Sequence, residues 1–163
     1  MSPAIVSLRR AGPDDVPALA QLYADCARRM GPKVYSIAQT EAWVRFAQDP
    51  AFTDYILGAD TLVANSEGDG AVVDGFCGVD AGGEIRSLYV RVERMRSGLG
   101  RALLGHALAH GQAQGLRRFG AWATPFSRPI FEAVGMPLVR CVTEPFQGVG
   151  FERYRMEGTP DVG

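Results

Sequence analysis

A glycine-rich segment in mid-chain, "RMRSGLGRALL" at residues 94–104, has the residue types and spacing of an anion site. It directly precedes a run of helix formers, so its main-chain N–H groups should lie at a helix N-terminus, where the helix dipole favours negative charge. Gly98 and Gly100 have no Cβ, which lets the backbone approach a bulky phosphate. Arg96 and Arg101 add positive charge. The segment predicts a pyrophosphate cradle.

Three other interpretations of this segment compete with the cradle. A Rossmann dinucleotide fingerprint needs a third glycine where this chain has Leu103, and it normally opens the first βα unit of a domain. A P-loop needs a Gly-Lys pair, which does not occur in the sequence. An ordinary strand-to-helix turn remains as the generic alternative.

Histidines and cysteines give weaker signals. His106 and His110 are four residues apart on one predicted helix, but a zincin motif needs glutamate at the position of Ala107. We expect packed histidines and no metal. Cys26, Cys77 and Cys141 are scattered without a C-x-x-C pair, which favours reduced thiols. Cys77 could be a nucleophile, but no histidine is suitably placed in the sequence, so a small core residue is the better interpretation.

The overall composition restricts the class of protein. A chain of 163 residues with 47% hydrophobic content is the size of one domain with a real core. The net charge of -1 gives no expectation of nucleic-acid or membrane partners. No apolar stretch approaches the roughly 20 residues that a membrane helix needs, and "MSPAIVSLRR" has no signal-peptide core. We therefore expect a cytoplasmic protein.

The elements that must position the cradle follow from periodicity and turn signals. Strands are expected at 4–10, 61–65, 71–79, 84–90, 117–123, 137–144 and 148–157. Helices are expected from Val16 to Gly31, over 37–48, from the glycine segment to about Gln114, and within 124–135. The order β-α-α-β-β-β-α-β-α-β-β predicts one α/β domain at 1–157 with a mixed sheet, followed by a tail at 158–163.

The strand "EIRSLYV" followed by "MRSGLGRALL" resembles the GNAT superfamily of acetyl-coenzyme A-dependent N-acyltransferases, whose motif reads R/Q-x-x-G-x-G/A. The element order agrees, so the resemblance covers nearly the whole chain and implies a GNAT-like fold with about seven strands and four helices. The pieces "YSIAQTEAW", "TPFSRPIFEAVGM" and "GFERYRME" resemble one bacterial branch of that superfamily, which says little about the acceptor.

The resemblance also implies roles for individual residues. Main-chain groups of Leu88, Tyr89 and Val90 should meet the pantetheine arm, and one of their N–H groups should polarise the thioester carbonyl. The pyrophosphate should be held by Arg96, Ser97, Gly98, Leu99, Gly100 and Arg101.

Four more residues lie where relatives bind the thiol end and the acceptor. Thr124 and Ser127 begin the short helix beside the cofactor's thiol, although helix capping explains them equally well. Tyr35 and Trp43 lie in the loop and helix that roof the acceptor pocket, although Trp43 is also explained as core.

The chain departs from the family pattern at two positions. Met95 stands where the motif usually has Arg or Gln, which removes a side-chain contact to phosphate. Phe131, beside the cofactor, stands where many members have a tyrosine that protonates the leaving thiolate, and phenylalanine donates no proton. Water or Tyr154 then does this work, or the thiolate leaves unassisted.

The mechanism implied is direct attack of an amine on the thioester in a ternary complex. An alkylamine has a pKa of about 10.4, so a base must accept its proton at neutral pH. Glu84 is the first candidate and Asp80 the second, and a solvated turn carboxylate is the alternative for both. Acidic residues including Asp74 would suit a cationic acceptor.

Two other functions stay open on the sequence alone. A non-catalytic acyl-CoA-binding sensor or regulatory module would bind the cofactor without turnover, and Phe131 gives it some support. A structural domain with a degenerate cradle would not bind coenzyme A. The sequence does not decide whether the chain forms a homodimer, as many relatives do.

Overall fold

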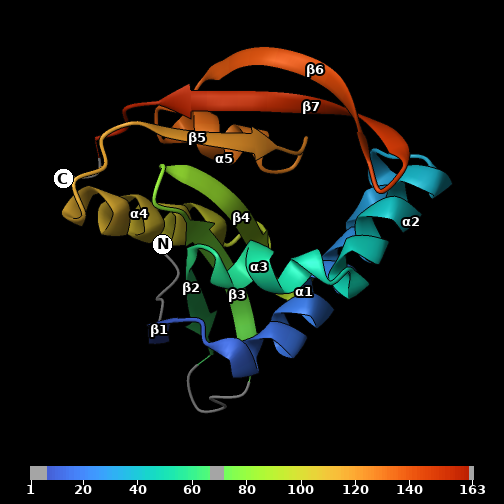
Figure 1. Ribbon diagram of the computed structural model, residues 1–163, viewed down its shortest axis with the longest axis horizontal. Coiled ribbons are helices and arrows are strands. Elements are labelled where there is room, and N and C mark those ends of the chain that lie inside the picture. The colour runs from blue at the N-terminus through green and yellow to red at the C-terminus, as the bar shows by residue number, and fades with distance from the viewer. Residues whose placement is uncertain (1–6, 67–71, 162–163) are drawn as a thin grey trace.

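The computed structural model describes residues 7–66 and 72–161. Within these ranges the strands are β1 (Ser7–Arg10), β2 (Asp60–Asn65), β3 (Val73–Val79), β4 (Glu84–Val90), β5 (Phe119–Ala123), β6 (Leu138–Phe146) and β7 (Val149–Gly158). The α-helices are α1 (Val16–Met30), α2 (Ile37–Arg45), α3 (Ala51–Leu57), α4 (Leu99–Ala113) and α5 (Arg128–Ala133). The strands form one mixed sheet in the order β1-β2-β3-β4-β5-β7-β6, in which only β4 and β5 run parallel (Figure 1). This confirms the predicted α/β fold.

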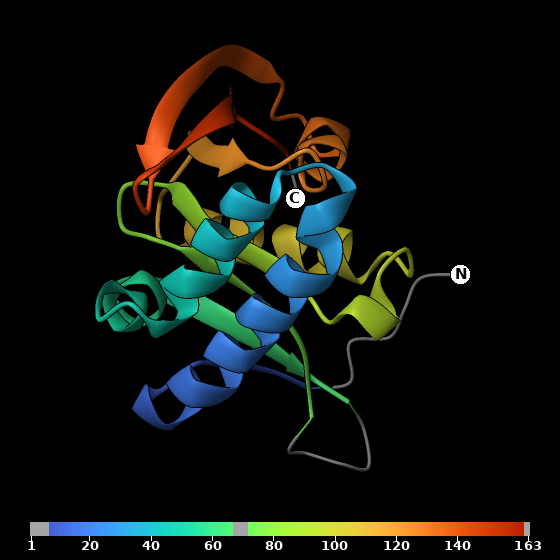
Figure 2. The ribbon, with the colours of Figure 1, turned by 90° about the vertical axis from the view of Figure 1, so that its right-hand side faces the viewer.

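The helices cover the sheet from both faces (Figures 1 and 2). Helix α4 buries Leu103, Leu104 and Leu108 against one face, and α1 buries Leu19 and Tyr23 against the other. Each buried leucine contributes about 1.5–3 kcal/mol to folding. Because successive strand residues point to opposite faces, the sheet supplies side chains to both cores. No helix in the described part of the chain is long and apolar enough to cross a membrane.

The structure has one helix more than the predicted order, because α3 follows α2 before β2 begins. Its start is marked by Asp49, whose carboxylate accepts a hydrogen bond from Ala51 N at 2.8 Å. "DPAFTDYIL" thus contained an acidic residue and a proline just before the helix, but the helix is too short for a clear period. The predicted strand at 4–10 is described from Ser7 onward, and the turn expected at 66–70 lies almost wholly outside the described residues.

Strands β6 and β7 form a long hairpin that arches over to α2 (Figure 1). Its two-residue turn has Gln147 at φ 51° and Gly148 at φ 78°, the positive pair that matches the twist of a hairpin. Three hydrogen bonds join the turn region to α2 and the segment after it: Gln39 to Gly150 O at 3.0 Å, Arg45 to Gln147 O at 3.0 Å, and Gln147 to Asp49 at 2.8 Å. The hairpin and α2 together close one side of the molecule.

Strands β4 and β5 separate after a short parallel contact. Only Glu84↔Gly120 and Ile85↔Ala121 pair between them. On the other edge of β4, Arg91 N donates to Asp74 O at 2.7 Å, so by alternation Tyr89 and Ser87 direct their peptide groups to β3. The peptide groups of Leu88 and Val90 therefore face away from β3, on the side of the gap between β4 and β5, where the Val90 carbonyl already accepts a hydrogen bond from the Cys26 thiol.

Candidate active site

The glycine segment forms an open loop at the start of α4. Arg96 has φ 60° and Gly98 has φ 86°, so the chain passes through the left-handed region twice before the helix begins. Within the described residues no protein acceptor takes the amide hydrogens of residues 96–101, and Ala102 N donates to Gly98 O at 3.1 Å. The loop therefore presents a row of free donors at the positive end of a 15-residue helix.

A buried carboxylate behind the loop fixes the segment that precedes it, residues 91–94. Asp74, 3% exposed, accepts hydrogen bonds from Arg91 at 2.9 Å and Arg94 at 3.1 Å. The Ser97 hydroxyl donates to Arg94 O at 2.5 Å, which links the clamp to the loop. Arg94 is thus used for structure. Asp74 lies away from the cavity described below, so it does not serve the cationic acceptor that its charge first suggested.

Arg96 and Arg101 are exposed to solvent, whereas Met95 packs in the interior. Arg96 and Arg101 are exposed, and within the described part of the chain neither forms an ion pair. Both are available to an anion at the loop. Met95, at the unusual motif position, packs between the two apolar cores, so it contributes to folding and leaves the phosphate contacts to backbone and arginine.

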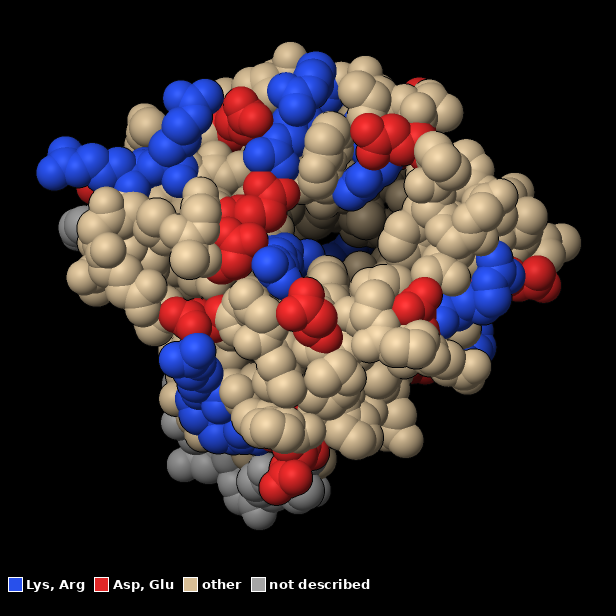
Figure 3. All heavy atoms as spheres, in the orientation of Figure 1, with Lys and Arg blue, Asp and Glu red and all other residues tan. Residues whose placement is uncertain are grey.

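A cavity of about 390 Å³ occupies the gap between β4 and β5 and extends toward α1 and α2. Figure 3 shows the hollow on this face, with arginine and carboxylate groups around it. Ten aromatic side chains line it: Tyr23, Tyr35, Trp43, Phe46, Tyr55, Tyr89, Trp122, Phe131, Phe146 and Phe151. Its charged lining residues are Glu84, Arg86, Glu152 and Arg153. The volume is that of a small-molecule site.

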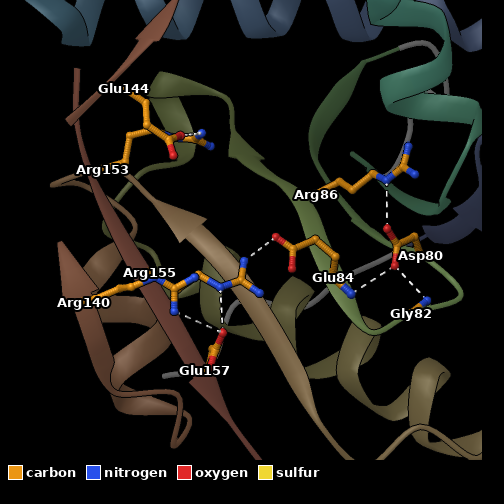
Figure 4. Close-up of polar contacts among 9 residues, drawn as sticks. All are labelled: Asp80, Gly82, Glu84, Arg86, Arg140, Glu144, Arg153, Arg155 and Glu157. Carbon is orange, nitrogen blue, oxygen red and sulfur yellow. Dashed lines mark hydrogen bonds and ion pairs between the residues drawn. The ribbon is translucent and has the colours of Figure 1, made fainter. Parts of the chain in front are cut away.

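The two candidate bases differ sharply in their surroundings (Figure 4). Glu84 lines the cavity and pairs with Arg155 Nη1 at 2.6 Å, leaving its other oxygen without a hydrogen bond among the described residues. Asp80 is fully engaged by the amides of Gly82 and Glu84, at 2.9 and 3.0 Å, and by Arg86 Nε at 3.1 Å.

The proton affinity of Asp80 follows from these contacts. Burial alone would raise the pKa of this carboxyl, but the Glu84 and Gly82 amides and the Arg86 guanidinium hold the pKa below its ordinary value. A weaker base tied into a turn is a poor proton acceptor, and Asp80 does not line the cavity. The geometry favours Glu84.

Gly120 makes the Glu84 ion pair sterically possible. A Cβ at this position would collide with the Arg155 guanidinium, which crosses the residue to reach Glu84. Arg155 is also held by Glu157 at 2.9 Å and stacks over Trp122, 5.2 Å from the ring centroid. The Glu84 carboxylate is therefore fixed in direction by a partner that is itself restrained.

Aromatic side chains from α1, α2, α3 and β4 form the far wall. Trp43 donates from Nε1 to the Tyr89 hydroxyl at 3.2 Å, and Tyr35 meets Trp43 edge-on with ring centroids 5.7 Å apart. Burial raises the pKa of Tyr35 and of Tyr89 to about 12, so both phenols are neutral at physiological pH. Tyr35 and Trp43 thus line the cavity. The Tyr89 ring is part of the same wall, and the Tyr89 peptide groups pair with β3.

Residues 32–159 match the family model of the acetyltransferase (GNAT) domain. The chain belongs to the GNAT acetyltransferase family. Among curated proteins there is no match.

Solved structures of other acetyltransferases have the same fold. A GCN5-related N-acetyltransferase from Rhodopseudomonas palustris is 24% identical over 98% of each chain, with a TM-score of 0.89. PaiA N-acetyltransferase from Thermoplasma acidophilum, solved with coenzyme A, is 17% identical over 94% of this chain and 98% of its own, with a TM-score of 0.70. A phosphinothricin acetyltransferase from Sinorhizobium meliloti, solved with acetyl-CoA, is 22% identical over 98% and 91%, with a TM-score of 0.65. At these identities the likeness extends to the fold alone.

The short-helix region of this GNAT chain has Phe131 at the position of the family's proton-donating tyrosine, and the alternative donor Tyr154 lies outside the cavity lining. Phe131 is 2% exposed and lines the cavity without a polar atom. Tyr154 is on β7 outside the cavity lining, and its hydroxyl donates to Glu152 at 2.7 Å. Thr124 and Ser127 cap each other: the Thr124 amide donates to the Ser127 hydroxyl at 3.0 Å, and the Ser127 amide to the Thr124 hydroxyl at 3.1 Å. Both residues also line the cavity, so local hydrogen bonding and contact with a bound cofactor both stay as interpretations of Thr124 and Ser127.

The histidines and cysteines of this GNAT chain lie outside the site. His110 contacts Asp60 at 2.8 Å and His106 is exposed. In the part of the chain that the structure describes, no three potential metal ligands lie together. Burial raises the pKa of Cys77 well above its ordinary value, which agrees with a core residue. Cys26 donates its thiol to Val90 O at 3.1 Å.

Several cavity residues were not identified from the sequence. They are Arg86, Trp122, Arg153, Phe46, Tyr55, Phe146 and Phe151. Their elements are far apart in the chain, and the local signal was the apolar face of the helix predicted over 37–48, which includes Phe46; in the structure Phe46 directly follows α2. Strand alternation in β7 does place Arg153 and Arg155 on one face, but it does not say which face carries the cavity.

Proposed function

We propose that this GNAT chain is an N-acetyltransferase that moves the acetyl group of acetyl-CoA to a primary amine by direct attack in a ternary complex. The observation that carries the proposal is the adjacency of two features. Free amides at residues 96–101 suit a pyrophosphate, and the unpaired edge of β4 leads from that loop into the cavity. A pantetheine arm needs such an extended edge to hydrogen-bond along.

The acyl donor would be held mainly by backbone. Arg96 and Arg101 would add charge at the pyrophosphate, and the peptide groups of Leu88 and Val90 would meet the arm. The Leu88 N–H is our candidate donor to the thioester carbonyl oxygen as negative charge develops there. Coenzyme A and acetyl-CoA in the PaiA and phosphinothricin acetyltransferase structures support this choice of donor.

The acceptor would enter from the aromatic side. Its nitrogen attacks the carbonyl carbon, the carbon–sulfur bond breaks, and the amine proton passes to Glu84 directly or through water. The thiolate of coenzyme A leaves and takes a proton from water, since Phe131 has none to give. The enzyme acts in the cytoplasm on this proposal, where its three free cysteines stay reduced.

Two measurements test the proposal together. Isothermal calorimetry should detect coenzyme A binding to the purified chain, and a free-thiol assay with acetyl-CoA and a panel of primary amines should show amine-dependent release of coenzyme A. Mass spectrometry should find the acetylated amine. Binding without turnover across the panel would replace this function with the acyl-CoA-binding module that the loss of the tyrosine at Phe131 favours. Absence of binding would leave a structural domain.

A further inference from the structure

We infer that the acceptor is a small α-amino acid with an apolar side chain, and that Arg153 receives its carboxylate. The inference rests on the proposed acetyl transfer and names the substrate class for the same site. Three features of the cavity support it: the partners of its carboxylates, the position and unused donors of Arg153, and the aromatic residues of its walls.

The acidic groups near the cavity are already committed to arginines or to backbone. Glu84 is paired with Arg155, and Asp80 is taken up by Arg86 and the turn. Glu152 accepts from Tyr154 at 2.7 Å. A polyamine would need a carboxylate for its distal cation besides the proposed base Glu84, and Glu152, already bonded to Tyr154, is the one other carboxylate among the described lining residues.

Arg153, in contrast, has unused donors. Its Nη1 donates to Glu144 at 2.9 Å, and its other nitrogens have no hydrogen-bond partner among the residues described. Glu144 is 46% exposed, so water weakens its attraction for the guanidinium. The guanidinium carbon lies over Trp122, 4.6 Å from the ring centroid, and this contact restrains the planar fork. A carboxylate is the group that matches two parallel N–H donors of such a fork.

Arg153 and Leu88 line the same cavity. β7, which carries Arg153, pairs with β5 through Ala123↔Tyr154, and β5 adjoins β4 at Glu84↔Gly120 and Ile85↔Ala121. The proposed carboxylate receptor and the proposed carbonyl donor on β4 therefore border one space. In an α-amino acid the amine and carboxylate share one carbon, and this arrangement suits them.

The walls select an apolar side chain of limited size. The hairpin that carries Arg153 also contributes Phe146 and Phe151 to the cavity wall. Tyr35 meets Phe151 with the ring centroids 5.2 Å apart. Hydrogen bonds join the hairpin to α2 on this side, and the volume of about 390 Å³ suits a single small acceptor better than a long peptide. Transfer would convert the amino acid and acetyl-CoA into the N-acetyl amino acid and coenzyme A, with the displaced proton going to Glu84.

The test compares acceptors that differ only at the carboxylate. Thiol release is measured with L-phenylalanine, L-phenylalanine amide, 2-phenylethylamine, spermidine and an N-terminally free hexapeptide. We expect kcat/KM for L-phenylalanine to exceed that of the amide and of 2-phenylethylamine at least tenfold. Equal or better turnover of 2-phenylethylamine, spermidine or the peptide would leave acetyl transfer standing and overturn the inference. Turnover of none of these would count against the inference, and failure of a broad amine panel against the proposed function itself.

A variant at Arg153 tests the assigned contact. Arg153→Gln should raise KM for L-phenylalanine at least tenfold while leaving kcat and the parameters for 2-phenylethylamine within twofold. Arg140→Gln is the matched control, because Arg140 also lies over Trp122, at 5.6 Å, but is outside the cavity lining. An equal loss for both acceptors in Arg153→Gln, or an equal effect of Arg140→Gln, would assign the residue to structure and overturn its role.

Discussion

The loop at residues 96–101 offers amide hydrogens from one contiguous segment, whereas the cavity beside it is walled by side chains from α1, α2, α3, α5 and four strands. Every residue of the loop supplies a peptide group, so its chemistry survives a change such as Met95 at the usual arginine or glutamine position. The cavity depends on side-chain identity. On the proposed function, the comparison teaches that the acyl-donor site depends on backbone and tolerates substitution, whereas the acceptor site depends on side-chain identity and is selective.

The same contrast appears in how the two regions are supported. The loop is held from behind by one buried carboxylate, Asp74, and two arginines. The cavity is held by the hairpin–α2 contacts and by the chain of ion pairs from Glu84 through Arg155 to Glu157. Substitutions in the loop should therefore change donor binding, and substitutions in the cavity should change turnover or acceptor choice.

The largest effect is expected for Glu84→Gln. The amide cannot accept the amine proton, so kcat should fall about a hundredfold or more while acetyl-CoA affinity stays unchanged. Stopped-flow and steady-state thiol release measure kcat, and calorimetry measures the affinity for acetyl-CoA. Glu157→Gln is the control, because Glu157 shares Arg155 but does not line the cavity. An equal loss in that variant would place the effect in Arg155 instead of in proton transfer.

Gly98→Val should weaken coenzyme A binding at the loop and leave the cavity unchanged. A β-branched residue at φ 86° costs ~1–3 kcal/mol, so coenzyme A should bind roughly tenfold to a hundredfold more weakly. Titration calorimetry measures the affinity, and circular dichroism checks the fold. The control is Gly105→Ala on the same helix, where a Cβ meets nothing within 4 Å. That change should keep affinity and stabilise α4 by up to about 1 kcal/mol. Undiminished binding in a folded Gly98→Val protein would contradict the assigned loop.

Asp74→Asn should weaken both the fold and the loop. Removing a buried charge from two arginine partners should lower the free energy of unfolding by about 2–3 kcal/mol, less than for a fully buried pair because both arginines are partly exposed. Denaturant titration measures the loss. Asp25→Asn, in an exposed pair with Arg29, should cost at most about 0.5 kcal/mol. Similar losses in the two variants would show that Asp74 stabilises the fold no more than an exposed ion pair does.

The smallest effect is expected for Tyr154→Phe. Its hydroxyl donates to Glu152 outside the cavity lining, so kcat should remain within about twofold of the parent. The hydrogen bond to Glu152 also raises the pKa of Tyr154, which makes the phenol a weaker acid. A hundredfold fall in kcat with unchanged binding would identify Tyr154 as the general acid after all.

The sequence by itself determined the seven strands, four of the five helices and the family resemblance, because each depends on neighbours in the chain. Strand alternation, turn signals and the Gly98–Gly100 spacing are local signals, and they placed β4, α4 and the loop between them correctly. Helix α3 was not predicted because seven residues carry too little period. The sequence ranked Glu84 before Asp80 as the base, but a solvated turn carboxylate explained either residue.

Only the tertiary structure distinguished those two carboxylates, since the difference lies in Arg155, which arrives from 71 residues away. It also decided that Asp74 and Arg94 serve the loop as a clamp and that Arg153 faces the cavity over Trp122. The physical reason is common to all of these. A backbone site is specified by consecutive peptide groups, whereas the protonation and partners of a side chain depend on charges and surfaces that folding brings from distant segments.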